Sequence, residues 1–134
     1  MIGEDVVDRL FALRAAGPFQ RLETAELLLI ASHVRTRHYA PGRVILAAGA
    51  VADLLVVRVA GAARLGQAEA PEVFDAPGLL FGLPAAADYV AGDAGLDALV
   101  IAKPHVFTIA RECPEFVVGL RALAVASPDA ERAA

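Results

Sequence analysis

The chain has 134 residues, the usual length of one domain, and its content of 57% hydrophobic and 21% charged residues excludes a disordered polymer. Its apolar runs, such as residues 54–60 and 96–102, end well before the roughly 18 residues that cross a bilayer, so no membrane span is predicted. The net charge of −4 disfavours nucleic acid as a partner, because phosphate binding needs a concentrated cationic surface.

Two helices are predicted before any strand, within about residues 5–32. Apolar residues at helical spacing predict an amphipathic helix over residues 5–16, and Gly17 and Pro18 end it. A second, leucine-rich helix is predicted over residues 23–32.

Short strands with turns between them are predicted over about residues 33–102. The alternation over residues 34–39 predicts a strand with one exposed face, and Pro41-Gly42 predicts the turn that follows. Further strands are expected over residues 44–46, 54–59 and 62–65, with turns at residues 49–53 and at Gly61.

The later part of this region has weaker signals. A polar connection at residues 66–71 leads to a short strand at residues 73–74 and a turn at Pro77-Gly78. A loop over residues 83–88 follows, and the remaining strands are expected at residues 89–90 and 98–102. Short strands at this spacing predict an antiparallel sandwich or barrel.

Helices are predicted again over about residues 103–126. Pro104 suits the start of a short helix, Pro114 interrupts it, and a last helix spans about residues 115–126. Apolar side chains of these helices include Phe107, Ile109, Phe116, Leu120 and Leu123. With no long repeat and no linker, the sequence predicts a single domain over residues 1–134.

Glycine and apolar positions in the early strands carry a family resemblance. They read Tyr39-x-Pro41-Gly42-x-Val44-Ile45-Leu46, then Gly49-x-x-Ala52-Asp53-x-Leu55-Val56-Val57, then Gly61-x-Ala63-x-Leu65. Over about residues 10–120 the chain resembles the cyclic-nucleotide-binding domain family, whose glycines form the corners of a roll. The resemblance implies a mainly β fold: an antiparallel, jelly-roll-like β-roll (a double-stranded β-helix) with helices at both ends.

The resemblance also implies where a ligand would bind. The family's cassette reads Phe-Gly-Glu, then, after a few residues, Arg followed by a small residue, Ala and Thr. The Glu holds the ribose hydroxyl, the Arg pairs with the cyclic phosphate, and a short helix offers free N–H groups. Here Phe81 and Gly82 match, but Leu83 replaces the Glu and Ala86 replaces the Arg. The candidate ligand-binding residues are Phe81, Gly82, Leu83, Ala86, Ala87, Asp88 and Tyr89.

These departures predict a degenerate cassette. Loss of the Arg removes a contact worth about 1.5–3 kcal/mol, or about one to two decades in affinity. Pro84 lacks an N–H group for a phosphate, and Asp88 and Asp93 add negative charge nearby. Binding of cyclic AMP or cyclic GMP in the usual way is therefore not expected, and no cofactor is predicted.

The expected function is non-enzymatic regulation through protein contacts. In relatives the last helix shifts when the cassette is filled, which implies signal transmission by Phe107, Phe116, Leu120 and Leu123; plain core packing is the other interpretation of each. The run at residues 81–84, with Ile101, Pro104 and Pro114-x-Phe116, resembles the amino-terminal domain of bacterial signal-transduction proteins that carry CBS and nucleotidyltransferase modules. Such modules, a partner protein or a second copy are the expected partners.

Other classes remain open. Arg58 and Arg64 are predicted near the roll's interior mouth, which would suit a nucleotide or small-ligand sensor with a rearranged cassette. The effector part of a transcription regulator is a further alternative, although only about 18 residues follow Phe116, too few for a winged-helix module. Arg35 and Arg37 share a face with Tyr39 and are interpreted as the solvated side of a strand, with an anion or partner contact as the alternative.

No metal site and no catalytic residue are predicted. The three histidines lack the spacing of a cupin metal site, and no serine lies in a nucleophile elbow. Cys113 is the only cysteine and is expected to be a small buried apolar residue. The acidic amino terminus lacks the pattern of a secretory signal, so a cytoplasmic location is expected.

Overall fold

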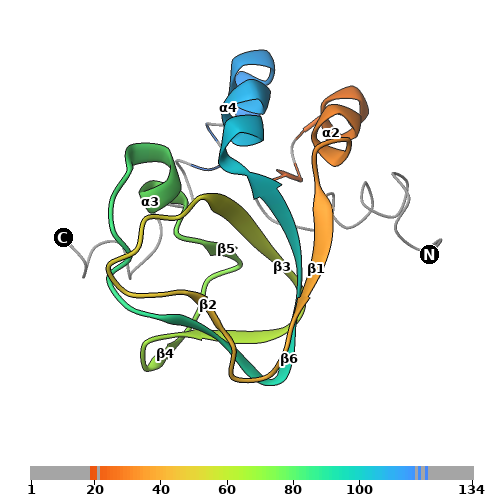
Figure 1. Cartoon of the computed structure of the whole chain (residues 1–134). Coiled ribbons are helices and arrows are strands. Elements are labelled where there is room, and N and C mark those ends of the chain that lie inside the picture. The colour runs from red at the N-terminus through yellow and green to blue at the C-terminus, as the bar shows by residue number, and fades with distance from the viewer. Residues whose placement is uncertain (1–18, 21, 117, 119, 121–134) are drawn as a thin grey trace.

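The computed structural model describes residues 19–20, 22–116, 118 and 120 (Figure 1). Its elements are α2 (Thr24–Ala31), β1 (Arg35–Tyr39), β2 (Val44–Leu46), β3 (Leu54–Leu65), β4 (Ala68–Glu69), β5 (Val73–Phe74), α3 (Ala76–Phe81), β6 (Tyr89–Ala102) and α4 (Lys103–Glu112). The helix predicted over residues 5–16 and most of the one predicted over residues 115–126 lie outside the described residues.

Two long antiparallel strands, β3 and β6, form the centre of the sheet. They pair from Leu54 opposite Ala102 to Leu65 opposite Tyr89, and the strand order is β1-β6-β3-β4. The short β2 also pairs with β6, and β5 also pairs with β3. Figure 1 shows the sheet bending into a roll, with α2 and α4 at one end. The predicted antiparallel β-roll with flanking helices is confirmed.

Gly61 bends a strand and does not end one, so the prediction of two strands separated by a turn is wrong. Its φ is +80°, and a Cβ atom there would meet the carbonyl oxygen of Gly95 on β6. The pairing with β6 shifts register on both sides of Gly61. A glycine within such irregularities lets a long strand curve while its ladder continues.

Three other stretches carry more regular structure than the sequence predicts. Residues 66–71, expected as a connection, include β4. Residues 89–90 and 98–102, expected as separate strands, belong to the single strand β6. Pro77-Gly78, expected as a turn, lies inside α3, where proline fits the first turn because its missing N–H would have no intrahelical acceptor.

The prediction that β1 exposes one face is also wrong. Its first four residues are all exposed, and only Tyr39 is buried. The strand pairs on one side with β6, and the neighbouring buried positions are Val34, just before the strand, and Tyr39, its last residue. Both faces of β1 are therefore solvated over residues 35–38.

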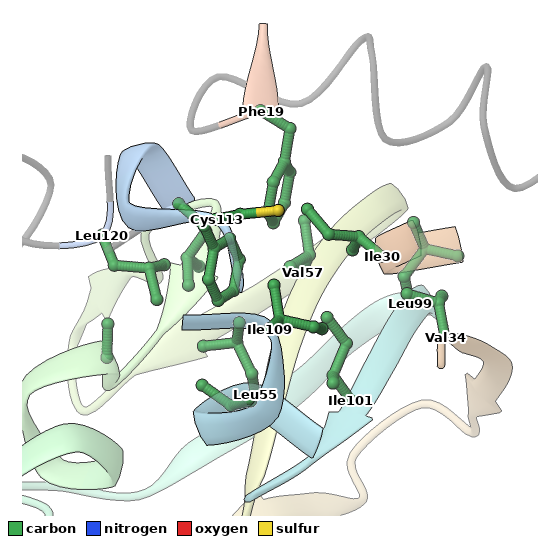
Figure 2. Close-up of a cluster of buried hydrophobic side chains, with 14 of the residues drawn as sticks. Phe19, Ile30, Val34, Leu55, Val57, Leu99, Ile101, Ile109, Cys113 and Leu120 are labelled. Atoms are coloured by element: carbon green, nitrogen blue, oxygen red, sulfur yellow. The ribbon is translucent and has the colours of Figure 1, made fainter. Parts of the chain in front are cut away.

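The core has two clusters on opposite faces of the central strands. The helix-side cluster packs Leu55, Val57 and Ile101 of the sheet against α2, α4 and residues near the described ends (Figure 2). Its nineteen buried residues are Phe19, Leu22, Leu27, Ile30, Ala31, Val34, Ala52, Leu55, Val57, Val73, Ala76, Leu79, Leu99, Ile101, Val106, Ile109, Cys113, Phe116 and Leu120. Cys113 is buried there, as predicted.

The roll cluster fills the interior of the roll. Its ten buried residues are Tyr39, Val56, Ala63, Ala70, Phe74, Tyr89, Ala91, Leu96, Ala98 and Val100. Neighbouring positions of β3 and β6 alternate between the two clusters, as the side chains of a strand buried on both faces must.

Candidate functional site

The cassette region begins where β5 enters α3. Asp75 joins the two elements in the left-handed conformation, with φ 49° and ψ 47°. Every other described residue with a positive φ is a glycine. The Asp75 Oδ1 atom accepts a hydrogen bond of 3.3 Å from the backbone N–H of Gly78. The chain's own carboxylate therefore caps the amino terminus of α3, as a helix N-cap does.

The environment of Asp75 is electrostatically unfavourable for its charge. Its Oδ2 atom is buried and has no hydrogen-bond partner. Burial raises the pKa of the Asp75 carboxyl above its ordinary value, and the hydrogen bond from Gly78 opposes this shift in part. A second anion at this end of α3 would face both this carboxylate and the same low-dielectric surroundings.

The predicted Phe81–Leu83 match lies at the other end of α3. Gly82 is the helix C-cap with φ 71°, and its N–H donates to the carbonyl of Gly78 over 2.8 Å. Phe81 is 67% exposed and Leu83 is also exposed. These side chains thus present an apolar surface at the carboxyl end of α3.

Residues 84–88 are tied to the loop between β2 and β3. Pro84 forms a bridge with Val51, and Ala85 exchanges two backbone hydrogen bonds of 2.8 Å with residues 49 and 50. Asp88 Oδ1 accepts a hydrogen bond of 2.7 Å from the backbone N–H of Ala48. Ala86 is exposed and Ala87 is half-buried. The segment is therefore held by backbone pairing, and the Asp88 carboxylate serves a neighbouring loop.

Tyr89 closes the segment inside the roll. It is buried, and its ring stacks on Phe74 with a centroid distance of 4.9 Å and an interplanar angle of 24°. Phe74 directly precedes Asp75 in the chain. The aromatic pair thus joins the two ends of the segment that contains α3.

The two arginines predicted near the interior mouth lie differently. Arg58 is half-buried, and its Nε atom is buried without a hydrogen-bond partner. Arg64 is exposed, and its guanidinium donates to the Gln67 carbonyl over 3.1 Å. Because Arg64 follows the buried Ala63 in the strand, its side chain lies on the face opposite the roll cluster.

The four predicted signal-transmitting residues do not share one environment. Phe116 and Leu120 are fully buried in the helix-side cluster, and the Phe116 ring stacks on Phe19 at 5.6 Å. Phe107 is 42% exposed, because Val106 and Ile109 form the buried side of α4. Leu123 lies outside the described residues.

Sequence reasoning missed Asp75 as a structured position and missed α3 altogether. The available signal was an Asp followed two residues later by Pro, the pattern of an N-cap and a first-turn proline. Interpreting Pro77-Gly78 as a turn concealed it. The left-handed conformation of Asp75 has no comparable signal in the sequence.

Two further features are absent from the described residues. No group of three or more His, Cys, Asp or Glu side chains there could hold a metal ion. None of the described helices combines the length and apolar character that a membrane crossing requires.

Among the comparisons with known proteins, the one with solved structures found matches. No protein-family model matches the sequence, and no curated protein is similar to it. Many solved structures are similar in fold, and three of them illustrate the likeness. The cyclic nucleotide-binding domain from Methylobacillus flagellatus has a TM-score of 0.72 at 14% identity, over 96% of this chain and 79% of that one.

The other two structures are longer proteins. The regulatory domain of Toxoplasma gondii PKA, crystallised with cAMP, has a TM-score of 0.71 at 14% identity, over 87% of this chain and 49% of that one. The Thermus thermophilus catabolite activator protein has a TM-score of 0.71 at 21% identity, over 82% of this chain and 57% of that one. The chain thus spans about half the length of these two. Its fold is that of the cyclic-nucleotide-binding domains.

Proposed function

We propose that this chain is a non-enzymatic regulatory domain of the cyclic-nucleotide-binding type that does not bind cyclic AMP or cyclic GMP in the usual way. It acts through protein contacts, with a partner or with additional modules such as CBS or nucleotidyltransferase domains. The similarity of fold to regulatory proteins supports the class. The charge of the cassette region supports the loss of binding.

The observation that carries this proposal is a long stretch without cations. Between Arg64 and Lys103 the sequence has six carboxylates and no lysine, arginine or histidine. This stretch contains β5, α3, the candidate cassette and all of β6. A cyclic phosphate held there would meet no guanidinium, and unpaired anions in a partly buried site repel one another strongly.

A second alignment of the cassette leads to the same conclusion. The short helix follows Phe74-Asp75, so Phe74, Asp75 and Ala76 are an alternative match to Phe-Gly-Glu. Residues 85–88, Ala-Ala-Ala-Asp, then stand where the family has Arg, a small residue, Ala and Thr. The Glu and the Arg are absent in either register, and Asp75 caps the helix end that a phosphate would need.

Isothermal titration calorimetry with cyclic AMP and cyclic GMP tests the proposal. The wild-type chain should give no heat of binding at micromolar concentrations. Clear micromolar affinity would overturn the proposal.

Two double variants restore the family's Glu and Arg, one for each alignment of the cassette. They are Leu83→Glu with Ala86→Arg, and Ala76→Glu with Ala85→Arg. A returned guanidinium–phosphate contact is worth about one to two decades in affinity. If only one of the two double variants binds the nucleotide, its alignment of the cassette is the correct one. The control is Ala62→Glu with Ala94→Arg, two exposed positions outside the segment, and it should bind no nucleotide.

A rearranged sensor is the second candidate, because the Nε atom of Arg58 is buried without a partner. An anion bound there would satisfy it. In the same calorimetry, binding by the wild-type chain that is lost in Arg58→Gln and kept in Arg64→Gln would favour this candidate.

A further inference from the structure

The outer edge of β1 is the strongest remaining feature of the fold. β1 stands at the end of the strand order, and among the described residues it pairs with β6 alone. In an antiparallel pair, alternate backbone N–H and C=O groups of an edge strand point away from the neighbour and stay available. Figure 1 shows β1 in orange at the border of the sheet.

This edge is regular. All five residues from Arg35 to Tyr39 pair with Val100 to Leu96 in one continuous register, without a bulge. No proline lies within the strand. Bulges and prolines are two of the devices by which proteins prevent strand addition at an edge, and β1 has neither; charged side chains are another, and the arginines of β1 act against a strand of like charge. A further extended segment could therefore continue the ladder.

Charge is the third observation, and it concerns the side chains beside that edge. Arg35 and Arg37 are exposed, and their cross-strand partners on β6 are the apolar Val100 and Ala98. The ion pair between β1 and β6 is His38 with Asp97, at 2.8 Å on the opposite face. Within the described part of the chain, the two arginines thus have no carboxylate partner.

The sequence around β1 is also more positive than the rest of the chain. Residues 27–52 contain no aspartate or glutamate but include three arginines, although the whole chain has a net charge of −4. The guanidinium of Arg37 lies 4.8 Å from the centroid of the Tyr39 ring, which fixes it over the end of the strand. Arg37 is exposed, and a guanidinium has N–H donors that can bind a carboxylate while its plane contacts a ring.

From these observations we infer that the β1 edge binds an extended acidic segment of a partner protein by strand addition. Backbone hydrogen bonds to β1 would hold the segment, and carboxylates at alternate positions would face Arg35 and Arg37. Charged pairs directly opposite one another on neighbouring strands are favourable when their signs differ. The inference gives a location and a chemistry to the protein contacts of the proposed function, on which it rests.

The same charges disfavour a second copy as the occupant of this edge. Antiparallel pairing of two β1 strands would place arginines of one copy beside arginines of the other, because residues 35 and 37 lie on one face. Like charges in this position destabilise a strand pair. An acidic segment would instead place carboxylates beside Arg35 and Arg37, so that attraction replaces the repulsion between arginines.

Fluorescence anisotropy with a labelled short peptide tests the inference. The peptide alternates glutamate with threonine, and a second version carries N-methyl groups along its backbone, which removes donors while keeping the charge. We expect the first peptide to bind the intact chain and the methylated one to bind at least about tenfold more weakly. Equal binding of both peptides would show plain surface electrostatics and would overturn strand addition.

Variants of the intact chain locate the site. Arg35→Glu with Arg37→Glu should abolish peptide binding, whereas the charge-matched pair Arg64→Glu with Arg111→Glu, at exposed positions away from β1, should keep it within about twofold. Equal loss in both pairs would contradict the edge as the site. Circular dichroism of both variants checks that each is folded.

Three further results bear on the partner. An oligothymidylate that competes with the peptide for the edge would overturn a protein segment as the occupant. So would self-association of the wild-type chain that Arg35→Glu with Arg37→Glu abolishes, measured by sedimentation. Cyclic nucleotide binding in the calorimetry above would refute the proposed function and leave the peptide result unchanged, so the two failures are distinguishable.

Discussion

The helix-side cluster and the roll cluster are built from different side chains. Four of the ten buried residues in the roll cluster are alanine, against three of the nineteen in the helix-side cluster. The large groups of the roll interior are aromatic, chiefly the stacked Phe74 and Tyr89. The helix side has interlocking leucine, isoleucine and valine, closed by the Phe19–Phe116 stack.

This difference separates two ways of filling a core. Small residues in the roll let its walls approach one another, whereas large aliphatic side chains join the helices to the outside of the sheet. The candidate cassette connects the two clusters, since Ala76 and Leu79 of α3 belong to the helix side and Tyr89 belongs to the roll. Movement of α3 would therefore disturb both clusters.

The largest expected effect is on the helix side. Phe116→Ala should lower the free energy of unfolding by about 3–5 kcal/mol, because it removes a fully buried ring and leaves a cavity. The matched change Phe107→Ala on exposed α4 surface should cost less than about 1 kcal/mol. Urea denaturation of both variants measures the difference. Similar losses would mean that Phe107 packs as Phe116 does, against the observed burial.

A smaller loss is expected where the walls of the roll approach. Gly61→Ala should cost about 2–4 kcal/mol, because the residue has a positive φ and its new Cβ would overlap the Gly95 carbonyl oxygen. Gly42→Ala is the control, with φ +79° and nothing within 4 Å of the added atom. It should cost about 1–2 kcal/mol, the backbone penalty alone.

Thermal and urea unfolding of the two glycine variants separate these contributions. Equal destabilisation would show that the close approach of β3 and β6 costs nothing beyond the backbone conformation. In that case the small residues of the roll cluster would need another explanation.

Local patterns predicted much of the fold. The turn at Pro41-Gly42 and the strands at residues 44–46 and 73–74 depend on backbone preferences and alternation within a few residues, and these were confirmed. The bend at Gly61 could not be predicted, because a glycine that ends a strand and one that curves it look alike in sequence. What decides between them is Gly95, thirty-four residues away on β6.

The candidate site was less accessible to sequence reasoning. The absence of cations from residues 65–102 is legible without a structure. The position of α3 is not, because its six residues are too few for a helical period and Pro77-Gly78 resembles a turn. The Phe-Gly pair that matches the family's cassette in sequence, at residues 81–82, lies at the end of the helix opposite to Asp75.

The smallest effect concerns Asp75, where the two clusters meet, and it is a change with pH. Burial raises the pKa of this carboxyl above its ordinary value of 3.8, so between that value and the folded-state pKa the native chain holds more protons than the unfolded chain. Rising pH therefore lowers the free energy of unfolding in this window. Asp75→Asn keeps an oxygen that can accept from Gly78, and asparagine tolerates the left-handed conformation.

The variant has no ionisable group at position 75, so its free energy of unfolding lacks the pH dependence that the Asp75 carboxyl contributes. The wild-type free energy of unfolding minus that of the variant should accordingly fall as pH increases from below 3.8 through the folded-state pKa, and urea denaturation at a series of pH values measures it. A difference that stays flat or rises with pH would mean that Asp75 is solvated in solution. The start of α3 would then be open to an anion, and the electrostatic argument against a cyclic phosphate there would rest on the missing arginine alone.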